Sequence, residues 1–175
     1  NPVPGALDVA GNILASGTIK SGGSITMDGT ARTITSDADI AVHVAADGAF
    51  RIESDPIAPN IIAGYLGNYV GDGVSGATIA GGGRTDDGIV GVDDNRVWDN
   101  YGTVGGGTGN EAGKNNFDTS DAAHATVGGG FSNIASGNSS TVSGGATNTA
   151  SGLYSTVGGG EVNTASGSHA TVAGG

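Results

Sequence analysis

The sequence has no cysteine, four prolines and only 5% aromatic residues over its 175 positions. Without cysteine, the chain has neither disulfides nor thiolate chemistry. The few prolines, and glycines that follow no strict period of three, exclude a collagen triple helix. Four leucines are too few for the 3.6-residue apolar pattern of a helical bundle. No apolar run approaches about 18 residues, so we expect no membrane insertion within this segment.

Positive charge is also scarce, because six basic residues stand against seventeen acidic ones and leave a net charge of −11. A nucleic-acid-binding protein needs a basic face to neutralise phosphates, so we expect no nucleic-acid partner. The three histidines, His43, His124 and His169, are far apart in the sequence and lack the spacing of zinc ligands.

Motifs for catalysis are missing as well. The sequence has no G-x-S-x-G nucleophile elbow, no H-E-x-x-H zinc motif and no P-loop. Paired carboxylates can cleave glycosides, as in phage tailspikes, but such enzymes build wide clefts with many aromatic residues. This chain has eight aromatic residues in all. We therefore expect that it is not an enzyme and needs no catalytic cofactor.

Glycine is abundant, with 36 residues, and much of it belongs to an internal repeat. The pattern Thr-Val-x-Gly-Gly begins at Thr126, Thr141, Thr156 and Thr171, and each start lies fifteen positions after the last. The segment x-x-Asn-x-Ala-Ser-Gly follows each of the first three starts. A unit of this length is too short for a pair of helices. It suits one coil of an all-β solenoid, in which two short strands are joined by glycine-rich corners.

Parallel stacking in register would place each residue over its equivalent in the next coil, about 4.8 Å away. Degenerate copies upstream extend the expected stack to seven rungs, anchored at Ile62, Ile79, Val104, Val127, Val142, Val157 and Val172. The other expected columns are Asn133, Asn148 and Asn163, then Ala135, Ala150 and Ala165, then Gly130, Gly145 and Gly160.

The chain divides by pattern into three parts. Residues 1–55 show period-two alternation with tight turns such as Asp28-Gly29, which predicts a small β-rich stalk or cap module. Residues 56–102 read as degenerate coils with an acidic insertion loop, and residues 103–175 carry the regular repeats. The long gaps at 80–103 and 108–125 are expected to form loops that leave the stack on one side.

The core of such a stack is thin, because each coil offers one valine and one alanine to the inside. Ordering a whole coil costs more free energy than burying these two side chains returns. We therefore expect self-association, with three identical columns around a common axis. Small residues favour this arrangement, because glycine and alanine let backbones approach closely.

The pattern T-V-x-G-G-x-x-N-x-A-S-G resembles the head repeat of trimeric autotransporter adhesins, the YadA-like head. Val157 falls on the family's valine, Gly160 on its first glycine and Asn163 on its serine. Ala165 and Gly167 fall on the family's alanine and final glycine. The resemblance implies a homotrimer of left-handed parallel β-rolls, covers residues 103–175 well and 60–102 weakly, and implies an extracellular, cell-surface location. The unit is one residue longer than the family's, and glycine or serine replaces the family's isoleucine.

The N-terminal part, residues 1–55, contains Gly11-Asn12-Ile13 and Ala15-Ser16-Gly17-Thr18-Ile19 and loosely resembles shaft segments of phage tail fibres. Two functions therefore stand side by side. The first is a structural and adhesive module of a bacterial cell-surface fibre, which binds a cell-surface glycan or a matrix protein. The second is a receptor- or glycan-binding segment of a phage or injection-particle fibre.

One cluster of acidic residues has the chemistry of a cation site. Hard cations take six to eight oxygen ligands, and carboxylates gathered in one loop can supply them. The cluster therefore suggests Ca²⁺, whereas the simpler interpretation is a solvated loop whose Asp and Asn side chains make turns. Its carboxylates are Asp86, Asp87, Asp93, Asp94 and Asp99.

Trp98 and Tyr101 stand beside this acidic loop, either as loop anchors or as a platform on which a sugar stacks. The asparagine column is interpreted as structural, because stacked amides can hydrogen-bond along the solenoid. The threonine column that begins each repeat fits β-branched strand propensity. A regular threonine array also occurs on ice-binding solenoids, which makes ice binding a distant third function.

Overall fold

The computed structural model describes residues 40–42, 50–84 and 93–175. The chain falls into two compact units, residues 1–35 and 36–175, and the first lies wholly outside the described residues. The sequence predicts a stalk or cap for residues 1–55, and most of these residues lie outside the described ranges.

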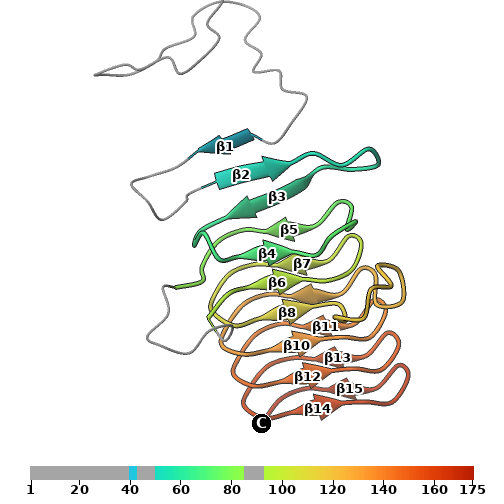
Figure 1. Cartoon of the computed structure of the whole chain (residues 1–175). Helices are drawn as coiled ribbons and strands as arrows, with labels where there is room; N and C mark the ends of the chain where they lie inside the picture. Colours follow the sequence, from blue (N-terminus) through green and yellow to red (C-terminus); the bar gives the residue numbers. More distant parts are fainter. Residues whose placement is uncertain (1–39, 43–49, 85–92) are drawn as a thin grey trace, which may run out of the picture. The chain divides into compact units, whose positions relative to one another are not determined.

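The described part of the second unit contains strands and turns and no helix, and its strands form two sheets (Figure 1). The larger sheet has nine strands in the order β1-β2-β3-β5-β7-β9-β11-β13-β15, and the smaller has six in the order β14-β12-β10-β8-β6-β4. The strands of the larger sheet are β1 (Ile40–Val42), β2 (Phe50–Glu53), β3 (Asn60–Ala63), β5 (Thr78–Ile79), β7 (Thr103–Val104), β9 (Thr126–Val127), β11 (Thr141–Val142), β13 (Thr156–Val157) and β15 (Thr171–Val172). Those of the smaller sheet are β4 (Tyr69–Val70), β6 (Arg96–Val97), β8 (Glu111–Ala112), β10 (Ile134–Ala135), β12 (Thr149–Ala150) and β14 (Thr164–Ala165).

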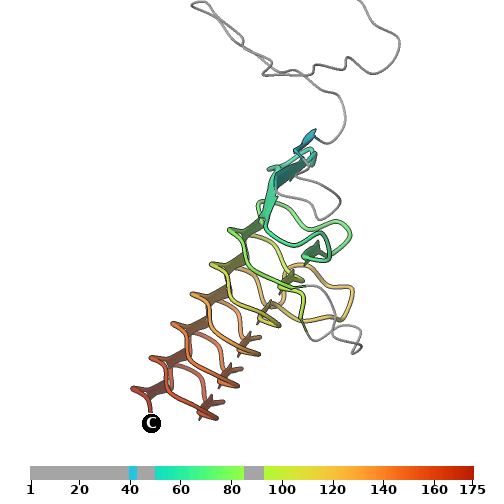
Figure 2. The same cartoon turned by 90° about the vertical axis from the view of Figure 1, so that its left-hand side faces the viewer.

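Along the chain from β3, successive strands alternate between the two sheets, and Figure 2 shows the sheets as two rows of strands on opposite sides of the stack. From β3 onward the strands of successive coils pair in parallel. The register stacks the seven anchor residues in the order expected from the repeat, from Ile62 on Ile79 to Val157 on Val172. The chain is therefore a β-solenoid whose regular coils each contain 15 residues.

Strands β1 and β2 lie in the segment that the sequence analysis assigns to the N-terminal module. They pair antiparallel with each other, and β2 pairs antiparallel with β3. The direction of pairing thus changes at β3, where the first parallel coil begins. These two strands extend the nine-stranded sheet and cover the edge of its first coil, as end caps of solenoids do.

The core of the solenoid lies between its two sheets and is filled by one chain. In each two-residue strand of the coils, the second residue points inward: Val142 and Ala150 are both fully buried, whereas their neighbours Thr141 and Thr149 are half-buried. The contiguous apolar core runs from Ile62 to Ala165. This placement follows from the period-two geometry of a strand, which sends alternate side chains to opposite faces. From the sequence we expected other copies of the chain to cover a thin core. In the structure the two sheets of one chain enclose it.

A ladder of asparagine side chains closes one corner of every coil. The Oδ1 of Asn148 accepts hydrogen bonds from the backbone N–H and the Nδ2 of Asn163, at 2.9 and 3.1 Å. Its Nδ2 donates to the carbonyls of Gly144 and Gly160, at 3.0 and 2.8 Å, and to Oδ1 of Asn133. The column comprises Asn68, Asn95, Asn110, Asn133, Asn148 and Asn163. Each buried amide therefore satisfies backbone groups that a corner leaves without strand partners.

The glycine column has a steric cause. Gly145 has φ of +94°, and a Cβ built on it would collide with the carbonyl oxygen of Gly160 in the next coil. Gly130 and Gly160 are in the same position, each against the glycine one coil further on. At this corner the backbones of successive coils approach too closely for any side chain.

We predict that Gly145→Ala destabilises the solenoid, by more than the roughly 1 kcal/mol expected from left-handed backbone strain alone. The matched control is Gly144→Ala, because a Cβ at Gly144 meets only the carbonyl oxygen of Gly129 at an ordinary 3.8 Å and its φ is not positive. Thermal unfolding followed by circular dichroism should show a clear drop in Tm for the first variant and little change for the second. Equal effects would contradict the steric explanation.

We predict that Asn148→Ala lowers the free energy of unfolding by about 2–5 kcal/mol, because it leaves several buried partners without hydrogen bonds. Asn138→Ala is the control: Asn138 lies at the opposite corner and is half-buried. Its side chain donates one long hydrogen bond of 3.4 Å to the carbonyl of Ser120 and accepts one of 3.0 Å from the Ser139 hydroxyl. Urea titrations should separate the two variants by well over about 1 kcal/mol. A similar small loss in both would mean that the ladder contributes little.

Candidate functional site

An excursion of the chain, residues 113–125, separates β8 from β9 and breaks the regular repeat. It occupies the second of the two long gaps that were expected to form loops. In Figure 2 this loop, drawn in yellow to orange, leaves the stack on the side of the six-stranded sheet. It is the most irregular feature of the described coils, and a surface pocket forms beside it.

The loop is held by Asp99, which is fully buried where the preceding coil turns. Its Oδ2 accepts the backbone N–H of Lys114 at 2.6 Å, and its Oδ1 accepts that of Ala122 at 3.3 Å. One carboxylate thus ties both ends of the excursion to the solenoid. Burial raises the pKa of this carboxyl above its ordinary value, although the two N–H donors act in the opposite direction.

A second acidic residue braces the loop from within. The Oδ2 of Asp121 accepts hydrogen bonds from Nζ of Lys114 at 3.0 Å and from Nδ2 of Asn116 at 2.9 Å. The hydrogen bond from Lys114 lowers the pKa of Asp121 below its usual value. Asp118 adds a local turn by accepting the backbone N–H and the hydroxyl of Ser120. The loop therefore has one defined shape in spite of its exposure.

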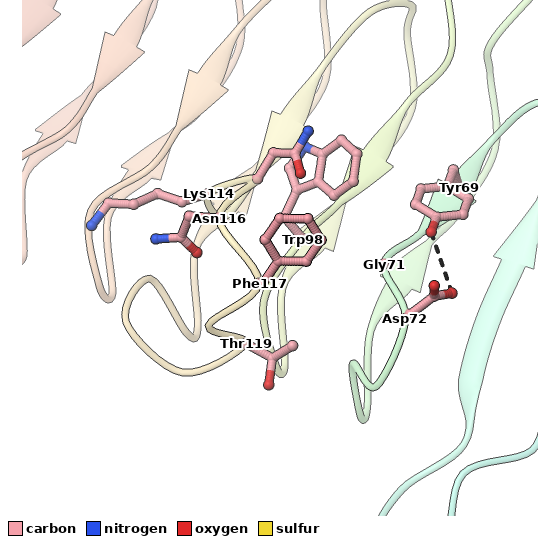
Figure 3. Close-up of a pocket in the computed structure, with 9 residues that line it drawn as sticks. Tyr69, Gly71, Asp72, Trp98, Lys114, Asn116, Phe117 and Thr119 are labelled. Atoms are coloured by element: carbon pink, nitrogen blue, oxygen red, sulfur yellow. Dashed lines mark hydrogen bonds between the residues drawn. The ribbon is translucent and has the colours of Figure 1, made fainter.

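The pocket lies between this loop and two neighbouring coils and encloses about 130 Å³ (Figure 3). The solenoid contributes a wall of aromatic and small residues, and the loop contributes polar side chains and one further aromatic ring. The lining residues are Tyr69, Gly71, Asp72, Trp98, Lys114, Asn115, Asn116, Phe117 and Thr119. In Figure 3, Trp98 lies between Tyr69 and Asp72 on one side and Lys114 and Asn116 on the other.

Trp98 packs against Tyr69 of the preceding coil in an edge-to-face arrangement, with ring centroids 5.5 Å apart and planes at 61°. Trp98 and Tyr101 were expected to act together beside the acidic loop, but Tyr101 does not line the pocket. It stacks instead on His124, with centroids 5.1 Å apart and planes at 9°. A second tyrosine–histidine pair, Tyr154 and His169, lies further along the same corner of the solenoid, with planes tilted by 36°.

The carboxylates considered for Ca²⁺ are engaged in other contacts where the structure describes them. Asp93 pairs with Arg84 at 3.0 Å, and Asp94 pairs with Arg96 at 3.5 Å. Within residues 40–42, 50–84 and 93–175, no three His, Asp or Glu side chains gather as metal ligands would. Asp86 and Asp87 lie outside these ranges, so Ca²⁺ binding stays a prediction.

The threonine that begins each repeat lies on the outer side of the nine-stranded sheet. The equivalent threonines of successive coils stack in register, for example Thr141 on Thr156 and Thr156 on Thr171. Thr103, Thr126 and Thr141 are half-buried, with their β-branched carbons in the pleat. The valine, alanine, asparagine and glycine columns line the interior and the corners, so these repeat residues have a structural role.

Sequence reasoning missed most of the pocket. Tyr69 and Asp72 belong to one segment and Phe117 to another, far along the chain, and none of the three carries a recognisable motif. The departure from the repeat at 113–125 was the available signal, because an insertion into a regular stack must leave it and create an irregular surface.

Comparisons of the chain with protein-family models, with curated proteins and with solved structures find no match. Among the described residues, no helix has the length and apolar character to cross a membrane.

We predict that Asp99 contributes a pH dependence of the following sign. Because its pKa is raised in the folded state, the fold holds this proton more tightly than the unfolded chain does. The free energy of unfolding of the natural chain relative to Asp99→Asn should therefore fall as the pH rises through the interval above 3.8. Urea unfolding of both proteins between about pH 3 and 7 measures the difference. A difference that grows with pH would mean that the N–H donors of Lys114 and Ala122 outweigh burial.

Proposed function

We propose that the chain is a structural and adhesive module of a homotrimeric fibre on a bacterial cell surface. In this role it binds host, matrix or neighbouring-cell surfaces and catalyses no reaction. The supporting observation is the stack itself: one coil shape repeats in register from β3 to β15, and its interior is filled by its own side chains. Such a stack acts as a rigid spacer and presents its outer side chains in regular columns.

The homotrimer and the left-handed winding are parts of this proposal that derive from the resemblance to YadA-like heads. Two further observations support association of copies. The interior of each regular coil holds one valine, one alanine, the asparagine and a small residue such as Ser140 or Ser155, which is a thin core. The regular coils also expose apolar side chains that association would remove from water. They are Phe131, Leu153, Tyr154 and Val162, with 44–69% of their surface exposed.

We predict that the chain sediments at three times its 16.7 kDa mass at micromolar concentration. If folding is coupled to association, the urea midpoint should also rise with protein concentration, because mass action favours the assembled state. Sedimentation equilibrium and unfolding at several concentrations test both expectations. A stable monomer with a concentration-independent midpoint would refute the trimer.

The adhesive role has a separate test. Beads coated with the chain should bind to glycan arrays or to surfaces coated with purified matrix proteins, and antibodies against the chain should label the outside of producing cells. Failure to bind any of these surfaces would leave only a spacer role and would refute adhesion.

A second candidate is a glycan-binding segment of a phage or injection-particle fibre. The aromatic pocket between Tyr69, Trp98 and Phe117 supports this second candidate as much as the first, since both kinds of fibre recognise surface glycans. Antibody label found on released particles and absent from the cell envelope would favour this second candidate over the first.

A further inference from the structure

The pocket beside Trp98 is not needed to build the solenoid. The regular coils from β9 to β15 stack without the 113–125 excursion, and their interior continues unchanged. The excursion nevertheless has its own bracing by Asp99 and Asp121. Its residues 114–121 add no buried side chain to the core and are yet held in one shape, which indicates a surface with a use of its own.

Phe117 is the most informative residue of this loop. Its side chain is fully exposed, at 104% of the reference area, and its φ is +68°. An exposed phenyl ring and a left-handed backbone at a bulky residue are both unfavourable in the free protein. The hydrogen bonds of Asn116 and Asp118 on either side fix the backbone that presents this ring. A ligand that covers the ring would offset the first of these costs.

The polar lining adds hydrogen-bonding groups at the rim of the aromatic surface. Asp72 contributes a carboxylate that accepts a long hydrogen bond of 3.4 Å from the Tyr69 hydroxyl. Asn115 contributes an amide and Thr119 a hydroxyl. The positive charge of Lys114 is balanced, because its ammonium group is paired with Asp121. The pocket is therefore apolar on its walls, and its rim offers hydrogen-bond acceptors and donors.

We propose that this pocket binds one neutral hexose unit of a surface glycan, with a face of the sugar ring against Trp98 and Phe117. Sugar rings combine an apolar C–H face with a rim of hydroxyl groups, which matches aromatic walls beside Asp72 and Asn115. The small volume suits a single ring. This inference deepens the adhesive role proposed above and rests on it.

Charge selects among the sugars. The carboxylate of Asp72 and the net charge of −11 disfavour uronic and sialic acids, whose carboxylates would be repelled. A quaternary ammonium compound is the competing ligand, since aromatic rings beside a carboxylate also attract cations. A quaternary ammonium group forms no hydrogen bond with the amide of Asn115 or the hydroxyl of Thr119, and for this reason we favour the neutral sugar.

The experiment uses a built-in reporter, because Trp98 is the single tryptophan of the chain. Glucose, galactose, mannose and N-acetylglucosamine are titrated separately into the full chain, and tryptophan emission is recorded. We expect at least one of them to shift the emission to shorter wavelength, with a Kd on the order of millimolar for a single ring. Glucuronic acid and tetramethylammonium are titrated in parallel.

Phe117→Ala should weaken the binding of the responding sugar on the order of tenfold, and Asp72→Ala should weaken it as well. Phe131→Ala is the matched control, because it removes another phenyl ring, half exposed, that does not line the pocket. Phe117 and Asp72 are exposed, so their two variants should keep the Tm of the natural chain. The Phe131→Ala variant is compared by its sugar binding alone, because Phe131 is among the side chains proposed to be covered in the trimer. Binding unchanged in Phe117→Ala would overturn the assignment of the pocket.

The remaining outcomes are also decisive. A response to tetramethylammonium and to none of the sugars would overturn the neutral hexose and show that the pocket binds a cationic ligand. No response to any probe would overturn the pocket while leaving the trimer and bead-adhesion results untouched. Sugar binding by a chain that sediments as a monomer would instead uphold this inference and refute the trimer.

Discussion

The stacking of equivalent backbone groups at the glycine and asparagine corner is the constraint on which the rest of the solenoid depends. Gly145 lies so close to Gly160 that no side chain fits between the coils. The amide of Asn148 must then reach carbonyls in its own coil and in the next one. Both conditions require successive coils to coincide at the glycine and at the asparagine. Between Gly82 and Asn95 the sequence is longer than between Gly145 and Asn148, and both contacts persist.

The chain varies in length between these fixed contacts. The stretch from Thr103 to Asn110 keeps the corner unchanged, and the excursion at 113–125 follows the second strand of that coil instead. Asp99 then supplies the hydrogen-bond acceptors that the displaced backbone needs, at the cost of burying a carboxylate. The irregular surface that carries the pocket is in this way grafted onto a stack whose interior stays regular.

The free energy of the fold comes from many small, equal contributions. Each regular rung adds one valine, one alanine, one small residue such as Ser140 or Ser155, and one asparagine with its hydrogen bonds. In a stack of this kind a coil contacts only its neighbours, so stability grows with the number of coils. Exposed rings such as Tyr154 and Phe131 contribute little to that interior and remain available for contacts with other molecules.

The period of the repeat, the register and the inward columns were all predictable from the sequence, because identical residues at equal spacing can stack in only one way. Ile62 and Ile79 were placed on the valine column from the glycines that follow them in degenerate copies of the repeat, and their pairing confirms the placement. The pocket was not predictable. Trp98 lies close to Tyr101 in the sequence, yet a turn intervenes, and stacking places Trp98 beside Tyr69 of another coil. Local sequence thus determined the repeating frame through its period, whereas the meeting of Tyr69, Trp98 and Phe117 was decided only by how the coils stack and where the loop returns.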